Sequence, residues 1–315
     1  MRAPQDIALD PRIHVSAPQL QRLAGAARDL RLLPRQPARS MLSGRHGSRL
    51  RGRGLIFEEL RAYVDGDDIR TIDWKVTART GAPHVRVYSE ERDRPALILV
   101  DQRMSMFFGS QVYMKSVIAA EAAALVAHRI LSQGDRVGGL VFTDDRMAEH
   151  RPQRSAAALS RLIGSIAAAN QALGADVEAP NPLPIDPVLR AARRIATTGG
   201  LVIILSDFHT LGPESAPHIQ ALARHNDLLL CPISDPLARE MPKTGRLPIS
   251  DAQLQAELDV SSPAQRAAVA EVFDRRLETL THWSRRYQAP LLPLTTERPA
   301  LDQLRLMMGL AEAPR

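Results

Sequence analysis

Cysteine, lysine and aromatic residues are scarce in this sequence, and it contains no long hydrophobic run. The single cysteine, Cys231, excludes an intramolecular disulfide framework and a cysteine-rich zinc site, and its apolar neighbours predict a small core residue. No run approaches the roughly 20 apolar residues that a membrane helix needs, and no short apolar segment near Met1 is typical of a signal peptide. These absences predict a cytoplasmic protein without a membrane span.

The basic residues are almost all arginine, and they are concentrated near the N-terminus. Only three of the 41 basic residues are lysine, namely Lys75, Lys115 and Lys243. Residues 1–61 carry 12 arginines against five acids, an excess of seven, whereas the whole chain has a net charge of +6. This N-terminal part is therefore a candidate surface for anionic partners.

A segment rich in glycine and arginine, SGRHGSRLRGRG (43–54), is typical of an exposed loop. It lacks the Gly-Lys-Ser/Thr ending of a phosphate-binding loop, which argues against nucleotide hydrolysis. A basic surface over residues 28–53 could bind nucleic acid electrostatically, but the nearest aromatic residue, Phe57, gives no stacking platform. Nucleic-acid binding is thus a weaker alternative, and its carriers would be Arg45, Arg49, Arg51 and Arg53.

Two domains are predicted from the change in pattern near residue 96. Residues 1–95 are expected to hold a helix over 17–33 and a small, mainly β module in which IRTIDWKV and HVRVYSEE form strands. From residue 96 to 315, apolar strands alternate with helices, which is typical of a doubly wound, mainly parallel sheet. The strands are expected at 96–100, 136–143, 201–206, 227–234 and 290–294, and the helices at 112–133, 155–169, from Asp186-Pro187 onward, 214–225, 263–288 and 299–309.

Two aspartates directly follow buried strands of this predicted sheet. Asp101 ends the run ALILVD and Asp207 follows LVIILS. Because sites in such sheets form beyond the carboxyl ends of the strands, the two carboxylates could hold a divalent cation, share a charged partner or cap helices.

The segment GDDIRTIDW (66–74) supports two interpretations. In a structural one, the acids cap turns and pair with nearby arginines, while Trp74 packs inward. In a functional one, the same residues form a surface on which a partner docks. The residues concerned are Arg61, Gly66, Asp67, Asp68, Arg70, Asp73, Trp74 and Arg79, with Asp65 as a further possible ion-pair partner.

Three segments together resemble the bacterial domain-of-unknown-function 58 family: RAYVDGDDIRTIDWKVTARTG, HVRVYSEERD and a strand ending in Asp-x-x-x-Ser-Met. The resemblance covers roughly residues 40–310. It implies a C-terminal domain of von Willebrand factor A type and a partnership with MoxR-type AAA+ ATPases and other von Willebrand A-type proteins. It assigns no enzymatic activity.

The resemblance also implies a metal-ion-dependent adhesion site, and this sequence departs from it. Asp101, Ser105 and Asp207 match the expected Mg²⁺ ligands, but Arg103 replaces the first serine. The segment PNPLPIDP (180–187), where a threonine ligand is expected, contains no hydroxyl. A cation among the ligands and a missing oxygen argue against Mg²⁺ binding. We therefore expect Arg103 to occupy or guard the vacant position and to satisfy both carboxylates.

The resemblance implies a non-enzymatic adaptor or assembly factor that acts with a MoxR-type ATPase, and the sequence contains no catalytic constellation such as Gly-x-Ser-x-Gly or His-Glu-x-x-His. A metal-dependent enzyme using Asp101, Asp207 and the acidic GDD segment is the first alternative. Nucleic-acid binding through the Arg/Gly loop is the second.

Overall fold

The computed structural model describes residues 10–30, 55–65, 67–90, 94–175, 183–239, 241–242, 246–250, 255–259 and 261–307. The chain divides into two compact units: an α/β unit, Met1–Pro34 with Arg94–Arg315, and a β module, Arg35–Asp93. The division predicted at residue 95 lies beside the second boundary. The predicted N-terminal domain, residues 1–95, nevertheless included residues that belong to the α/β unit. The helices within residues 10–30 bury Leu20 and Ala27 in the core of that unit.

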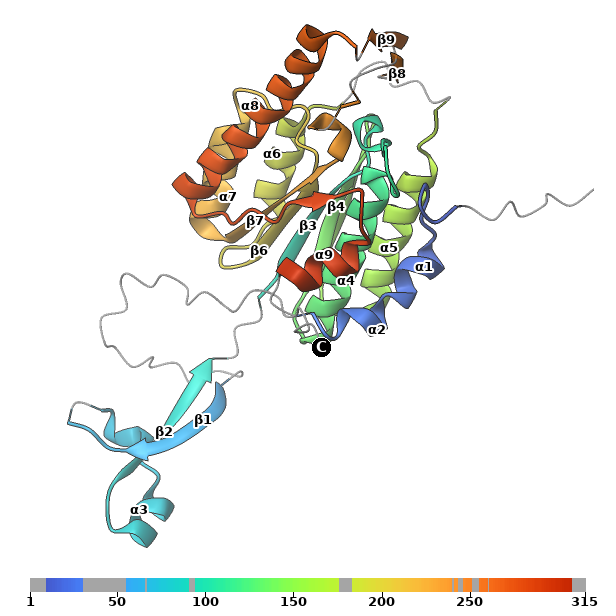
Figure 1. The fold of residues 1–315 in the computed structure, drawn as a ribbon. Coiled ribbons are helices and arrows are strands. Elements are labelled where there is room, and N and C mark those ends of the chain that lie inside the picture. The colour runs from blue at the N-terminus through green and yellow to red at the C-terminus, as the bar shows by residue number, and fades with distance from the viewer. Residues whose placement is uncertain are drawn as a thin grey trace, which may run out of the picture. The chain divides into compact units, whose positions relative to one another are not determined.

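The α/β unit is built on a six-stranded sheet in the order β10-β7-β6-β3-β4-β5 (Figure 1). All neighbouring strands are parallel except β5, which runs antiparallel to β4. The predicted doubly wound, mainly parallel fold is confirmed. The strands are β3 (Ala96–Asp101), β4 (Val137–Phe142), β5 (Met147–Gln153), β6 (Leu201–Ser206), β7 (Asp227–Ser234) and β10 (Leu294–Thr295).

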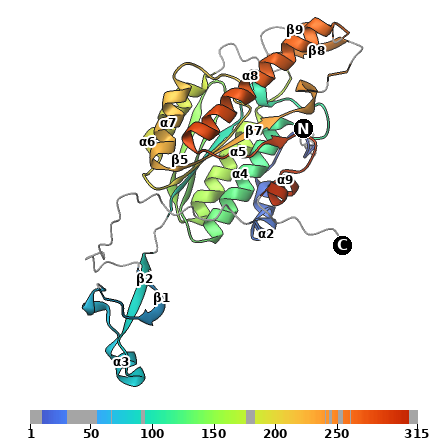
Figure 2. The same ribbon diagram turned by 60° about the vertical axis from the view of Figure 1, so that its left-hand side comes forward.

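Helices cover both faces of the sheet and enclose two hydrophobic cores (Figures 1 and 2). In β3, Ile98 and Val100 face one core and Leu97 and Leu99 the other, as the alternation of a strand requires. One face carries α1 (Ala17–Arg22), α2 (Ala24–Ala27), α4 (Lys115–Ser132), α5 (Ala156–Gln171) and α9 (Ala300–Met307). The other carries α6 (Ile185–Ile195), α7 (Ser215–His225) and α8 (Pro263–Tyr287). No helix in the described ranges is both long and apolar enough to cross a membrane.

Two parts of the α/β unit were not predicted from the sequence. β5 is a half-exposed edge strand whose polar residues and Pro152 give no apolar run, and proline is tolerated there because an edge strand needs fewer ladder hydrogen bonds. A separate antiparallel hairpin joins β8 (Arg246–Ser250) to β9 (Gln255–Asp259). In addition, β10 is shorter than the predicted strand over 290–294, of which only Leu291 forms an isolated bridge, with Leu230.

The β module pairs β1 (Leu55–Ala62) antiparallel with β2 (His84–Glu90). The connection contains the 3₁₀ turn η1 (Ile69–Thr71) and the helix α3 (Trp74–Thr80), so the strand predicted for IRTIDWKV is wrong. Its apolar alternation is overridden by capping, because the Asp73 carboxylate accepts hydrogen bonds from the backbone N–H groups of Lys75 and Val76.

Candidate functional site

Asp101 and Asp207 lie at the point where the winding of the sheet reverses. β3 is hydrogen-bonded to β4 on one side and to β6 on the other, and the chain continues from β3 through β4 to the edge strand β5 before it crosses back to β6. Asp101 ends β3 and Asp207 directly follows β6, so both carboxylates occur at the carboxyl ends of adjacent parallel strands. This is the position at which doubly wound sheets place their sites, as the sequence predicts.

Arg103 points into the protein and binds Asp101. Its Nε lies 2.9 Å from Asp101 Oδ1 and its Nη2 lies 2.6 Å from Asp101 Oδ2, while the arginine side chain is only 1% exposed. Nη1 donates to the backbone oxygen of Leu183 and to the Thr210 hydroxyl. Burial alone lowers the pKa of Arg103, but Asp101 outweighs this effect and raises that pKa above its ordinary value. The guanidinium is therefore a fixed charge of the site.

Lys115, the first residue of α4, pairs with the second carboxylate. Its Nζ lies 2.7 Å from Asp207 Oδ2, and the Asp207 side chain is almost completely buried. Burial alone raises the pKa of Asp207, but Lys115 and then Arg103 hold that pKa well below its ordinary value. The expectation that Arg103 hydrogen-bonds both carboxylates is therefore wrong: within the described residues each carboxylate has its own cation.

The residues of this site do not fit a divalent metal ion. The Asp101 carboxylate accepts from the hydroxyl of Ser206 at 2.6 Å as well as from Arg103, so both its oxygens are engaged. Two fixed cations balance the two carboxylates, and a cation about 4 Å from a divalent ion would oppose its binding by roughly 8 kcal/mol at an effective dielectric of about 20. The buried hydroxyl of Ser105 has no hydrogen-bond partner among the described residues, but a single neutral oxygen is not a metal site.

The backbone after β6 is turned sharply at Phe208, which adopts a left-handed conformation with φ 54°. Its N–H donates to the Ser206 hydroxyl, and the next N–H, of His209, donates to Asp207 Oδ1. A left-handed bulky residue is strained, and surrounding structure must hold it in place. Here the buried Phe208 ring fixes the turn that presents Asp207 to Lys115.

Arg276 of α8 completes the surroundings of Asp207. Its Nη1 donates to the backbone oxygen of Asp207 at 3.1 Å, and its Nη2 lies 3.0 Å from His209 Nδ1. Burial lowers the pKa of His209 first, and the neighbouring Arg276 lowers it further against the opposing effect of Asp207. Sequence reasoning missed Lys115, Ser206, Thr210 and Arg276. Only Lys115 carried a signal, as one of three lysines in the chain.

The acids of the β module have the predicted structural roles in part. Arg61 binds Asp67 through two hydrogen bonds of 2.8 and 2.7 Å, while Asp68 caps η1 and Asp73 caps α3. The predicted ion pairs of Arg70 and Arg79 are absent from the described part of the module, where Arg70 instead donates its backbone N–H to Asp68. Gly66 lies outside the described residues.

The predicted inward packing of Trp74 is wrong. Its side chain is 69% exposed, and α3 buries none of its residues. Ile69 and Val64, on the same connection, are 64% and 61% exposed, and Leu60 at the end of β1 is 39% exposed. The caps fix the backbone of this connection, from which Val64, Ile69 and Trp74 face solvent while Ile72 and Val76 are half-buried. We call Leu60, Val64, Ile69 and Trp74 the apolar set of the β module.

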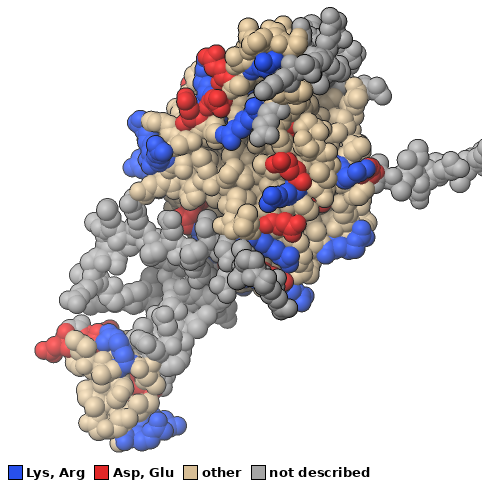
Figure 3. Space-filling view, in the orientation of Figure 1, with Lys and Arg blue, Asp and Glu red and all other residues tan. Residues whose placement is uncertain are grey.

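The Arg/Gly loop with Arg45, Arg49, Arg51 and Arg53 lies outside the described residues, so its predicted exposure is untested. On the face of the α/β unit shown in Figure 3, basic and acidic side chains are interspersed rather than gathered into one basic patch. The described residues on this face therefore offer no electrostatic footprint for nucleic acid.

Residues 59–279, more than half of the chain, match the model of a family described as "Protein of unknown function DUF58". The chain belongs to the DUF58 family. Its sequence is 32% identical over 285 residues to uncharacterized proteins of Mycobacterium bovis and of two strains of Mycobacterium tuberculosis, covering 90% of this chain and 88% of each relative. These relatives assign no activity to this DUF58 protein.

Two solved structures show a distant likeness. One is titled a conserved hypothetical protein BatB from Bacteroides thetaiotaomicron, with 12% identity, a TM-score of 0.38, and coverage of 69% of this chain and 100% of that one. The other is titled von Willebrand factor type A from Catenulispora acidiphila, with 12% identity, a TM-score of 0.35, and coverage of 71% and 43%. Similarity at this level carries no argument about what the DUF58 protein binds.

Proposed function

We propose that this DUF58 protein is a non-enzymatic cytoplasmic adaptor or assembly factor that acts with a MoxR-type AAA+ ATPase and with other von Willebrand A-type proteins. The observation that carries the proposal is the exposed apolar set of the β module. The identity of the partner rests on the resemblance of the GDDIRTIDW and Asp-x-x-x-Ser-Met motifs to those of the family.

The apolar set has the chemistry of a protein-docking surface. Tryptophan is enriched among the residues that dominate binding energy at interfaces, and Trp74 is the most exposed large apolar side chain in the described residues. The side chains stand on a connection that is held by the Arg61–Asp67 pair and by the caps Asp68 and Asp73. A backbone ordered in this way reduces the entropy that a partner must remove on binding.

The polar site of the α/β unit supports a binding role over catalysis. Asp101 and Asp207 are each held in an ion pair with a basic side chain, so carboxylate oxygens that a general base would use are already engaged by the protein. The same pairing removes the oxygens that a metal-dependent enzyme would use. The degenerate adhesion site is thus proposed to be a structural element that holds the loops after β3 and β6 together.

A capture experiment tests the proposal. The tagged full-length chain would be recovered from its native host under nucleotide-trapped conditions, and its partners identified by mass spectrometry. We expect an AAA+ ATPase well above background with the wild-type chain. Trp74→Ser and Ile69→Ser should each reduce this recovery at least about tenfold, since central interface residues contribute about 2 kcal/mol or more.

Val272→Ser is the matched control, because Val272 is an exposed apolar residue of α8 in the α/β unit. It should recover the ATPase as well as the wild type does, and all three variants should retain the wild-type melting temperature. Repeated capture of no ATPase, or equal capture by the Trp74, Ile69 and Val272 variants, would show that the proposal is wrong.

A further inference from the structure

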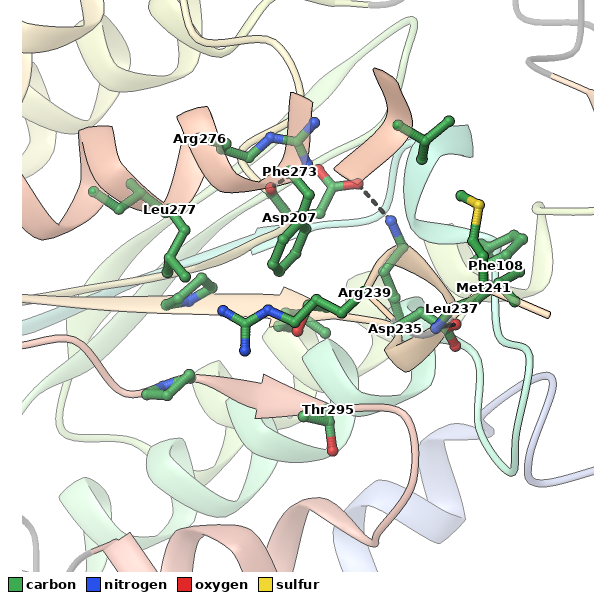
Figure 4. Close-up of a pocket in the computed structure, with 17 residues that line it drawn as sticks. Phe108, Asp207, Asp235, Leu237, Arg239, Met241, Phe273, Arg276, Leu277 and Thr295 are labelled. Carbon is green, nitrogen blue, oxygen red and sulfur yellow. Dashed lines mark hydrogen bonds and ion pairs between the residues drawn. The ribbon is translucent and has the colours of Figure 1, made fainter. Parts of the chain in front are cut away.

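A cavity of about 510 Å³ opens beside the polar site, beyond the carboxyl end of β7 (Figure 4). It is bounded by α8, by the 3₁₀ turn η3 (Pro236–Ala238) that follows β7, and by β10. A volume in this range is typical of sites for small organic molecules. Neither the family match nor the relatives assign a ligand to it.

Apolar side chains form most of its wall. α8 contributes Val269, Phe273, Leu277 and Leu280, which recur at the spacing of one helix face. Ile233 of β7 and Leu237 of η3 line it as well. Such a wall favours a ligand with an apolar body and disfavours one that is polar throughout, such as a sugar or a nucleotide.

Two carboxylates among the described residues line the cavity, and both are already engaged by donors of the protein. Asp207 accepts from Lys115 and from the backbone of His209. Asp235 accepts from the side chain and backbone of Ser110, from the backbone of Leu237 and from the Thr296 hydroxyl. These hydrogen bonds occupy the oxygens of both carboxylates, and the described lining carries three basic side chains, Lys115, Arg239 and Arg276, against these two acids, which disfavours a cationic ligand.

Among the described residues, Arg239 is the lining cation that no group of the protein engages by a hydrogen bond or ion pair. Its guanidinium stands 5.0 Å from the centre of the Phe273 ring and makes no hydrogen bond or ion pair within the described residues. Figure 4 shows this side chain extending along β7, with Phe273 of α8 on one side and Thr295 of β10 on the other. Stacking on Phe273 orients the planar guanidinium, which is suited to bind a carboxylate through two parallel hydrogen bonds.

From this arrangement we propose that the cavity binds a small amphipathic carboxylate, with an apolar chain of medium length between α8 and β7 and a carboxylate on Arg239. Lys115, whose ammonium uses one of its donors on Asp207, and Arg276 add positive charge to the same lining. The proposal is independent of the adaptor function and of any ATPase.

Calorimetric titration of the purified full-length chain with decanoate tests the proposal. Decanol and decylamine, which share the chain but carry no charge or a positive charge, are the matched ligands. We expect saturable binding of decanoate with a Kd on the order of 100 μM. Decanol should bind at least about tenfold more weakly than decanoate, because it cannot form the hydrogen-bonded ion pair with Arg239. Decylamine should not bind measurably.

Variants locate the site. Arg239→Gln should weaken decanoate binding about tenfold and leave decanol unchanged, whereas Arg275→Gln, an exposed arginine of α8 that does not line the cavity, should change neither. Leu277→Trp or Val269→Phe should fill the cavity and abolish binding of both ligands, and Val272→Trp should not. A wild-type melting temperature in each variant excludes unfolding as the cause.

Three results would overturn the proposal: no saturable binding of decanoate by the wild type, equal affinity for decanoate and decanol, or decanoate binding by Arg239→Gln at wild-type strength. If both cavity-filling variants have a lowered melting temperature, a second experiment on the wild-type chain locates the site. Bound decanoate should protect Lys115 from acetylation of its amine, which mass spectrometry measures. Unchanged acetylation at saturating decanoate would then contradict the assignment.

Discussion

The guanidinium of Arg103 donates two hydrogen bonds to the carboxylate of Asp101, two residues earlier in the chain, and both side chains are almost completely buried. The same guanidinium reaches Leu183 and Thr210, so three loops at the carboxyl edge of the sheet meet at one cation. A metal ion in this position would have to displace a charge that the fold itself supplies.

Divalent metal should therefore have no effect on stability. We expect the wild-type chain to melt at the same temperature in millimolar Mg²⁺ and in a chelator, measured by scanning calorimetry. A ligand at 100 times its Kd would contribute about 2.7 kcal/mol, which is readily detected. A clear Mg²⁺-dependent rise in melting temperature would contradict the geometric argument.

Replacing Arg103 with serine should destabilise the α/β unit by about 3–5 kcal/mol, because it leaves the buried Asp101 carboxylate without its cation. Arg103→Lys should lower the free energy of unfolding less, since lysine keeps the positive charge but lacks the planar guanidinium that donates two hydrogen bonds to Asp101. Part of the loss in Arg103→Ser should return on addition of Mg²⁺. Urea denaturation measures all three, with Arg275→Ser, an exposed control, expected within about ±0.5 kcal/mol. Wild-type stability in Arg103→Ser would refute the structural role.

Stability should fall in acid through Asp207. The pKa of Asp207 in the folded chain lies below the value of about 3.9 in an unfolded one. Its contribution is therefore present above about pH 4 and is lost as the pH falls through the folded pKa. We expect the stability of Asp207→Asn to depend less on pH below about 4 than that of the wild type or of Asp274→Asn, an exposed control on α8. If the free energy of unfolding of Asp207→Asn changes with pH below about 4 as much as that of the wild type, the Lys115–Asp207 pair is not the cause of the acid sensitivity.

Two glycine-to-alanine substitutions should have opposite effects. A Cβ at Gly138 in β4 would lie 2.3 Å from the backbone oxygen of His150 in β5, so Gly138→Ala should cost about 1–3 kcal/mol through overpacking. A Cβ at Gly164 in α5 meets nothing within 4 Å, so Gly164→Ala should stabilise by about 0.5–1 kcal/mol through helix propensity. Thermal unfolding of both variants checks the pair, and a stable Gly138→Ala would mean that β5 can move away from β4.

The sequence by itself determined the buried strands and most of the helices of the α/β unit, together with the places of Asp101 and Asp207. Continuous apolar runs such as ALILV and LVIILS can be buried on both faces only in a covered sheet, so β3 and β6 were predicted within one residue of their ends. Since carboxyl ends of parallel strands share one edge, Asp101 and Asp207 could be assigned to one site. By contrast, IRTIDWKV was wrongly predicted as a strand. Its apolar and polar residues alternate as in a strand, but the Asp73 side chain caps the helix α3 and so favours a helix instead.

Only the tertiary structure decided which groups meet at that edge. Lys115 and Asp207 are 92 positions apart in the sequence. Their pairing requires the first turn of α4 to lie close to the carboxyl end of β6, and no local sequence pattern encodes that placement. The exposure of Trp74 and the cavity under α8 likewise depend on what packs against each helix. Periodicity and capping act over a few residues and so can be predicted from sequence, whereas the partners of a buried charge are set by the strand order and the loops it brings together.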